Sequence, residues 1–178
     1  MTRSRAAMRQ ALLGLLGEMP FEAVTGAMVA ERAEIGYATY FRHYADPRDL
    51  LVDTVAHLAD SLVQRMMPAL LATQSHEAAR LLVNAVEADR ASYIALLGGA
   101  GDATRGMLAR ILSERLEALP DLSPPWLPHR LAVRFAIVGT VEILDWWLRE
   151  EPELDPQEIA TIIERLILAQ INASHTRD

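Results

Sequence analysis

The sequence predicts an all-α protein in two parts: an N-terminal three-helix domain that contains a helix-turn-helix (residues 1–46) and a larger C-terminal helical domain (residues 47–178). Three observations support this prediction. Apolar residues recur at helical spacing along most of the chain. Two short segments joined by a tight turn occupy residues 25–44, and prolines or glycines separate the longer segments that follow.

The composition fits a globular protein that works without cysteine chemistry. Hydrophobic residues make up 51% of the chain, enough to bury a core, and cysteine is absent, which excludes disulfides and thiolate sites. No apolar run reaches the ~18 residues needed to span a bilayer, and no N-terminal signal pattern is present. We therefore expect a cytoplasmic protein with no membrane segment.

Residues 25–36 predict the first half of a helix-turn-helix. The hydroxyl of Thr25 can accept a hydrogen bond from a free backbone N–H of the following turn, and Met28 and Val29 give that short helix a buried face. Residues 33–36 are too few for anything but a turn. Gly36 either caps the next helix or takes a backbone conformation closed to other residues.

The third helix, roughly residues 37–44, has the composition of a recognition helix. Ala38, with either Tyr40 or Phe41, is expected to anchor it inward. Aromatic, hydroxyl and cationic groups on one short exposed helix suit a DNA groove. The side chains expected to face outward are Tyr37, Thr39, Arg42 and His43.

Five longer helices are predicted in the remainder of the chain. Asp46 and Pro47 form a good start signal for the first of them, in which Pro68 should cause a bend or an end. Asp155 and Pro156 give the last helix a similar start. The expected ranges are 46–72, 75–97, 102–119, 127–150 and 155–172.

An ordered set of motifs between residues 8 and 51 resembles the DNA-binding domain of the TetR family of bacterial transcriptional regulators. The motifs are a first helix with Ala11–Glu18, a loop with Pro20–Thr25, Ala30-Glu31-Arg32-Ala33, Thr39-Tyr40-Phe41-Arg42-His43-Tyr44, and Asp46 ahead of Leu50-Leu51.

The resemblance implies a dimeric, ligand-responsive regulator that binds a double-stranded DNA operator. In its simplest form this is a repressor that a small effector releases from DNA, with a C-terminal domain for effector binding and dimerisation and with no cofactor. The candidate DNA-contacting residues, from the motifs and from the placement of arginine, are Arg3, Arg5, Thr25, Gly36, Tyr37, Ala38, Thr39, Tyr40, Phe41, Arg42, His43 and Arg48.

Four expected polar DNA contacts are missing or altered in this chain. The family's usual Gly-Val-Ser turn is replaced by residues 34–36, Glu-Ile-Gly, and Ala27 stands where some members have a base-reading arginine. Phe41 replaces a tyrosine that binds phosphate, unless Tyr40 supplies the hydroxyl, and Pro47 replaces a lysine. Because phosphate neutralisation supplies much of DNA affinity, we expect weaker binding or a heavier reliance on the arginines.

The charge distribution also predicts weak DNA binding. The net charge is −7, and the first 52 residues contain six arginines against six acidic residues, so the predicted DNA-binding part is neutral rather than basic. Arg3 and Arg5 are expected in an unstructured N-terminus, as a basic arm or as a frayed, solvated end. An alternative therefore stands: a helical adaptor on the same scaffold that binds a protein or a ligand and reads no DNA.

The last two predicted helices carry more apolar surface than one chain can cover. Apolar residues occupy most of the circumference of residues 127–150, and residues 155–172 show the same excess. We predict a twofold homodimer in which these helices form a four-helix bundle, with Gly139 permitting a close crossing.

The family resemblance also implies an effector pocket among the middle helices. Its apolar character would suit a hydrophobic or aromatic effector, with Arg65, Arg90 or Arg134 as the polar anchor, although apolar residues at such spacing are more often simply core. The expected lining residues are Leu62, Met66, Tyr93, Leu97, Met107, Ile111, Trp126 and Trp146.

Enzyme and metal functions find little support. Asp53, His57 and Asp60 share a helical face, but an exposed trio of this kind is more often solvated than metal-binding. Glu142 and Asp145 lie on an expected interface helix. No nucleophile triad, phosphate loop or nucleotide-binding fingerprint is present.

Overall fold

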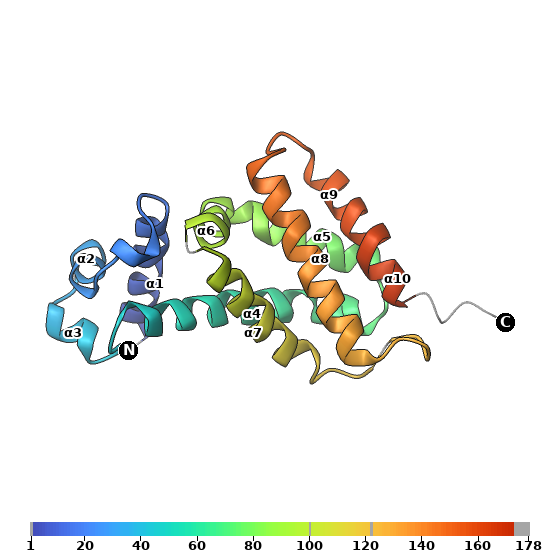
Figure 1. Ribbon diagram of the computed structural model, residues 1–178, viewed down its shortest axis with the longest axis horizontal. Coiled ribbons are helices and arrows are strands. Elements are labelled where there is room, and N and C mark those ends of the chain that lie inside the picture. The colour runs from blue at the N-terminus through green and yellow to red at the C-terminus, as the bar shows by residue number, and fades with distance from the viewer. Residues whose placement is uncertain (1, 100, 122, 173–178) are drawn as a thin grey trace. The chain divides into compact units, whose positions relative to one another are not determined.

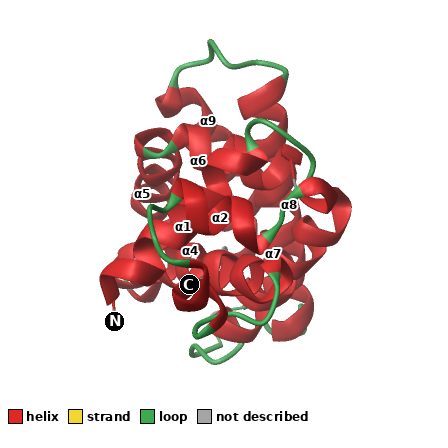
Figure 2. Cartoon of the chain, turned by 90° about the vertical axis from the view of Figure 1, so that its left-hand side faces the viewer, coloured by secondary structure: helices red, strands yellow, loops and turns green. Residues whose placement is uncertain are grey.

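The computed structural model describes residues 2–99, 101–121 and 123–172, and over these residues the chain is helical with no strand (Figures 1 and 2). It divides into two compact units. The first unit is Met1–Leu58 with Ala91–Met107, and the second unit is Ala59–Arg90 with Leu108–Asp178. Within the described residues, no helix is long and apolar enough to cross a membrane.

The elements follow one another in the order drawn in Figure 1. Helix α4 continues without interruption from the first unit into the second, and the chain returns to the first unit from α6 to the start of α7. The α-helices are α1 (Thr2–Leu16), α2 (Gly26–Arg32), α3 (Tyr37–Phe41), α4 (Pro47–Leu71), α5 (Ser75–Ala88), α6 (Arg90–Ile94), α7 (Gly101–Leu116), α8 (His129–Arg149), α9 (Pro156–Ile163) and α10 (Ala169–Asn172). A 3₁₀ turn, η1 (Phe21–Ala23), and two π-helical turns, η2 (Ala95–Gly99) and η3 (Glu164–Leu168), complete them.

The core of the first unit joins α1, α2, α3 and the start of α4 to η2. Met8, Leu12 and Val29 are fully buried together with Val55 and Leu96. Asp46 caps α4 as predicted, because its Oδ1 accepts hydrogen bonds from the backbone N–H groups of the next turn. The three-helix arrangement predicted from the sequence is therefore present, with η2 as an additional part of its core.

Two predicted helices are interrupted in the structure. The helix expected over 75–97 breaks at Asp89, whose backbone leaves the helical region with φ −133° and ψ 41°, and then continues as α6 and η2. The last helix runs from α9 to α10 through the π turn η3. Pro68 does not end α4, which continues to Leu71.

The second unit is built around α5, α8 and α9. The Trp147 side chain is fully buried, and its indole N–H donates to the Leu154 carbonyl at 3.2 Å. The Arg90 guanidinium lies 4.7 Å from the centre of the Trp147 ring, a cation–π contact. A Cβ at Gly139 would lie 2.6 Å from Cδ1 of Ile167, so Gly139 allows the close crossing of α8 and η3 within one chain.

Candidate functional site

The helix-turn-helix begins with the cap that the sequence predicts. Oγ1 of Thr25 accepts a hydrogen bond from the Met28 backbone N–H at 3.3 Å. The turn after α2 places Glu34 in the left-handed region, with φ 54°, and lets the Ile35 N–H donate to the Ala30 carbonyl at 3.0 Å. Gly36 caps α3 with an ordinary extended backbone (φ −67°, ψ 142°), so capping is the one of its two predicted roles that the structure supports.

Helix α3 is anchored by Tyr40, whose side chain is fully buried. The ring packs against Gly26 so closely that a Cβ at that glycine would lie 2.6 Å from Cε1 of Tyr40. Sequence reasoning did not identify Gly26. The available signal was its place as the first residue of α2, where a glycine has no capping advantage and therefore indicates close packing.

Burial changes what Tyr40 can contribute to DNA binding. Burial first, and then the negative charges of Asp46 and Asp49, raise the pKa of the Tyr40 phenol to about 12. Its hydroxyl is enclosed and has no hydrogen-bond partner among the described residues. Tyr40 therefore does not offer the phosphate-binding hydroxyl missing at position 41, an alternative that the sequence left open, because its side chain is fully buried.

The outward face of α3 is more apolar than predicted. Tyr37 is 60% exposed and Phe41 is 46% exposed, and Ala38 and Arg42 lie beside them on the surface. Ala38 was expected to face inward, and the structure contradicts this because Tyr40 alone fills the space behind the helix. Thr39 and His43, which were expected outside, are half-buried.

A hydrogen-bonded ion pair holds the end of the recognition segment. Oδ2 of Asp53 accepts from the Tyr44 hydroxyl at 2.7 Å and from Nη1 of Arg9 at 3.0 Å. Burial and the bond to Asp53 raise the pKa of Tyr44, and the positive charges of Arg5 and Arg9 act in the opposite direction. The network ties α1 and α4 to the segment that follows α3, and it places the charge of Arg5 near that segment.

The six arginines of residues 1–52 fall into two groups. Arg9 and Arg32 are committed to intramolecular ion pairs, Arg32 through two hydrogen bonds to the Glu18 carboxylate at 2.8 and 2.6 Å. Four others are exposed and form no ion pair with the described residues: Arg3, Arg5, Arg42 and Arg48. Arg3 and Arg5 lie within α1, so the prediction of an unstructured N-terminal arm is wrong over residues 2–16.

The eight residues expected to line an effector pocket are divided between the units. Tyr93, Leu97 and Met107 belong to the first unit, and the other five belong to the second. Buried members are Leu62, Tyr93, Leu97 and Ile111, and half-buried members are Met66, Met107 and Trp146.

Trp126 and the three expected polar anchors have other surroundings. Trp126 is 75% exposed and lines an open groove with Leu131 and Phe135. Arg65 and Arg134 are exposed. The Arg90 guanidinium is occupied by Glu87 and the Pro152 carbonyl.

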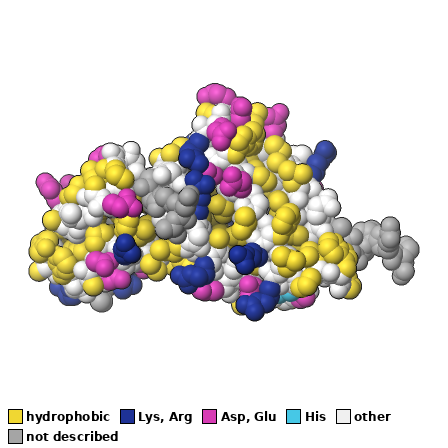
Figure 3. All heavy atoms as spheres, viewed as in Figure 1, with side chains coloured by type: hydrophobic (Ala, Val, Ile, Leu, Met, Phe, Trp, Pro, Cys, Tyr) yellow, Lys and Arg dark blue, Asp and Glu magenta, His cyan; other side chains and the backbone are white. Residues whose placement is uncertain are grey.

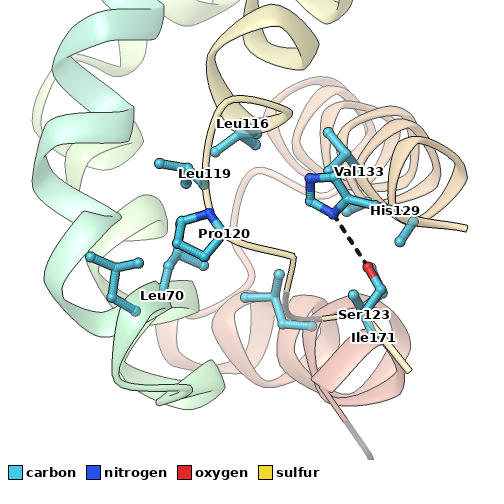
Figure 4. Close-up of a pocket in the computed structure, with 12 residues that line it drawn as sticks. Leu70, Leu116, Leu119, Pro120, Ser123, His129, Val133 and Ile171 are labelled. Atoms are coloured by element: carbon cyan, nitrogen blue, oxygen red, sulfur yellow. Dashed lines mark hydrogen bonds between the residues drawn. The ribbon is translucent and has the colours of Figure 1, made fainter. Parts of the chain in front are cut away.

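The second unit contains an apolar cavity of about 110 Å³ that the sequence did not predict (Figure 4). Figure 4 shows Leu70, Leu119 and Pro120 on one side of it and His129 and Val133 on the other. The lining comes from the ends of α4 and α7, the loop after α7, the start of α8 and the last turns of the chain. The residues are Leu70, Leu71, Leu116, Leu119, Pro120, Ser123, His129, Ala132, Val133, Ala136, Leu168 and Ile171.

His129 and Ser123 are the polar side chains in the lining of this cavity. Nδ1 of His129 lies 3.1 Å from Oδ1 of Asp121 and 3.5 Å from Oγ of Ser123. The Ser123 backbone N–H donates to Asp121 at 2.8 Å, and this bond, followed by the Ser123 hydroxyl and then by His129, lowers the pKa of Asp121. Nε2 of His129 is buried without a hydrogen-bond partner among the described residues.

The acidic residues considered for catalysis or metal binding have other partners. Asp53 binds Arg9 and Tyr44, and Oδ1 of Asp60 accepts from Nε of Arg115 at 2.8 Å. Asp145 is buried in an ion pair with the arginine one turn further along α8. Within the part of the chain that the structure describes, no three acidic or histidine side chains are grouped to hold a metal ion.

Comparison with known proteins gives relatives by structure and none by sequence. No protein-family model and no curated protein sequence matches the chain. The fatty acid degradation regulator FadR from Bacillus halodurans superimposes with a TM-score of 0.72 at 19% identity, over 92% of this chain and 94% of that one.

Two further structures contain acyl-CoA. FadR from Bacillus subtilis, in complex with stearoyl-CoA, gives a TM-score of 0.70 at 16% identity over 93% of this chain and 98% of that one. FadR from Thermus thermophilus, a TetR-family transcriptional repressor in complex with lauroyl-CoA, gives 0.61 at 17% identity over 98% and 96%. At these identities the similarity establishes the fold. The chain has the fold of the TetR-family transcriptional regulators.

Proposed function

We propose that the protein is a dimeric, ligand-responsive transcriptional regulator that acts in the bacterial cytoplasm, most simply as a repressor released from its operator by a small apolar effector. The observation that carries the proposal is the helix-turn-helix itself. Helix α3 is fixed from behind by Tyr40 and exposes its outer face, and four arginines of the same unit are exposed and form no ion pair with the described residues. This combination meets the two needs of DNA docking, a helix for the groove and cations for phosphates.

An effector site is supported by the cavity in the second unit. Its lining is almost entirely apolar, which suits a fatty or aromatic molecule, and His129 and Ser123 offer the few polar groups that orient a ligand. The Bacillus subtilis and Thermus thermophilus structures of this fold hold stearoyl-CoA and lauroyl-CoA. We therefore take an acyl chain as the first effector class to test, and lauroyl-CoA and lauric acid as its probes.

Dimerisation is supported by an apolar face on the second unit. Leu131, Phe135 and Val138 are each more than half exposed at helical spacing on α8, and Leu166 of η3 is also exposed. Hydrophobic side chains gather over α8 on the face drawn in Figure 3. An apolar stripe of this kind is usually covered by a partner, and a second copy would pair the two DNA-binding units.

The proposal is tested by titrating the full chain against DNA from upstream of its own gene, over a series of salt concentrations. We expect sequence-selective binding whose affinity falls as salt rises, because arginines release counterions from the phosphates. Arg42→Ala should weaken binding and lower the salt slope by about 1. The matched control is Arg110→Ala, which removes an exposed guanidinium of the second unit and should change neither quantity.

Addition of lauroyl-CoA or lauric acid to the complex should release the DNA. A slope near zero, or equal affinity for unrelated DNA, would contradict the DNA-binding function and favour the adaptor alternative. If the protein binds its operator and neither probe changes this binding, the proposal of a DNA-binding regulator stands and the acyl effector is rejected.

A further inference from the structure

Helix α3 presents a paired aromatic surface to the outside. Tyr37 and Phe41 are four residues apart and therefore lie on one face of the helix. Their ring centres are 4.6 Å apart with an interplanar angle of 62°, an edge-on contact. Phe41 also contacts the ring of buried Tyr40, with centres 5.1 Å apart and an angle of 77°. The exposed pair is thus held in place by a ring that belongs to the core.

The chemistry of this surface is unusual for a helix that binds DNA. Its polar candidates Thr39 and His43 are half-buried, and the exposed positions are Tyr37, Ala38, Phe41 and Arg42. Three of these four side chains offer apolar contact. Among the base edges in the major groove, the one apolar group is the C5 methyl of thymine.

We propose that Tyr37 and Phe41 form an apolar reading pair that recognises thymine methyl groups in the operator. The inference rests on the proposed function, because it needs α3 to enter the major groove. It assigns base specificity to the aromatic rings and leaves phosphate binding to the exposed arginines. Phe41 lacks the tyrosine hydroxyl that would bind a phosphate, and on this proposal its ring contacts a base edge instead.

DNA fits this surface better than a protein partner does. An exposed aromatic pair can also anchor a protein interface. However, α3 and the three residues after it contain no acidic side chain, and Arg42 is exposed in the same stretch. The charge of Arg5 acts on Tyr44 at the end of this segment. An exposed arginine beside an apolar surface matches a methyl group next to a phosphate.

The test deletes thymine methyl groups without changing base pairing. Preferred sites are first selected from a random duplex library with the full chain, and each thymine is then replaced by uracil, which lacks only the C5 methyl. We expect one or two positions in each half-site to lose about fourfold in affinity per methyl. Phe41→Ala should weaken binding to the thymine site and remove the penalty at one of these positions. Tyr37→Phe keeps the ring and should retain the whole pattern.

Ile94→Ala, which shortens an exposed apolar side chain of α6, is the control and should leave the uracil penalties unchanged. Thermal melting confirms that each variant is folded. Selective binding that is indifferent to uracil everywhere, or uracil penalties that persist in Phe41→Ala, would overturn the reading pair while leaving the regulator intact. Failure to select any DNA would overturn both, and would assign the aromatic surface to a protein partner.

Discussion

Tyr40 combines a structural role with an energetic cost. Its ring fills the space between α3 and Gly26, and its hydroxyl is enclosed without a hydrogen-bond partner among the described residues. A buried hydroxyl without a partner costs about 1–3 kcal/mol relative to one in water. The ring is therefore the useful part of this residue, and its hydroxyl should be dispensable for folding.

Replacement of Tyr40 by Phe should leave the free energy of unfolding unchanged or raise it by about 1 kcal/mol at neutral pH. The difference in the free energy of unfolding between Tyr40→Phe and the wild type should grow in alkali. The pKa of folded Tyr40 is raised to about 12, so above about pH 10 the unfolded chain loses a phenolic proton that the folded chain keeps, and folding is progressively disfavoured as pH rises. Urea denaturation at neutral and alkaline pH measures both effects. A Tyr40→Phe protein that is less stable than the wild type would show that the hydroxyl has a partner in solution.

Sequence reasoning could not determine which of Tyr40 and Phe41 is buried. The pattern predicted that one of Tyr40 and Phe41 would be inside, but it could not decide between neighbours on a helix of five residues. Such a helix makes little more than one turn, so periodicity has too few positions to define a face. The choice depends on Gly26, which lies on another helix and leaves room for Tyr40 alone.

At the scale of elements, the turn between α2 and α3 is strained. Glu34 has φ 54°, a conformation that costs an L-residue about 1–2 kcal/mol and that glycine adopts freely. The acidic side chain is also exposed next to the helix that we assign to DNA. One residue therefore lowers both the stability of the turn and the attraction for phosphates.

Replacement of Glu34 by Gly should raise the free energy of unfolding by up to about 1 kcal/mol, the strain relieved less the entropy that glycine adds to the unfolded chain. It should also tighten DNA binding, since a negative charge is removed. Thr73→Gly is a matched control: Thr73 is also left-handed, with φ 53°, at the end of α4. It should gain similar stability with no change in DNA affinity. If only Thr73→Gly is stabilising, the turn at Glu34 is not strained.

Caps were the most predictable parts of the elements. Thr25, Asp46 and Asp155 each accept a backbone N–H at the start of the helix that the sequence assigned to them. These interactions are local, so neighbouring residues suffice to define them. The break at Asp89 and the π turns η2 and η3 were not predictable, because no proline or glycine precedes them and tertiary packing decides where a helix absorbs an extra residue.

At the scale of the whole molecule, the apolar face of α8 determines the assembly that we propose. Phe135→Glu places a charge at the centre of this face and should give a monomer at micromolar concentration, because burying an unpaired carboxylate in an apolar interface is costly. Light scattering measures the mass, and circular dichroism should show an unchanged helix content. Operator affinity should fall as well, since the two α3 helices would no longer be linked.

Val52→Glu, at an exposed apolar position of α4 in the first unit, is the control and should remain dimeric. A wild-type monomer, or a Phe135→Glu dimer, would show that another surface joins the chains.

The effector residues were the least predictable feature at this scale. Of the residues predicted to line an effector pocket, Leu62, Tyr93, Leu97 and Ile111 are buried, but burial is shared by core and cavity residues alike. The cavity in the second unit arises where the end of α4, the end of α7 and the start of α8 meet the last turns of the chain. A local sequence pattern cannot predict that segments so distant in the chain lie together.

The first unit is built from two separate stretches of the chain, and this limits how the unit can be exchanged by recombination. Residues 91–107 complete a core begun by residues 1–58, and Leu96 in this segment is fully buried. The unit that we propose to bind the operator is therefore not one continuous segment that recombination can cut at one point and join to another sensor domain. A hybrid regulator made from this protein would need to carry both stretches, and operator preference and the middle of the chain should diverge together.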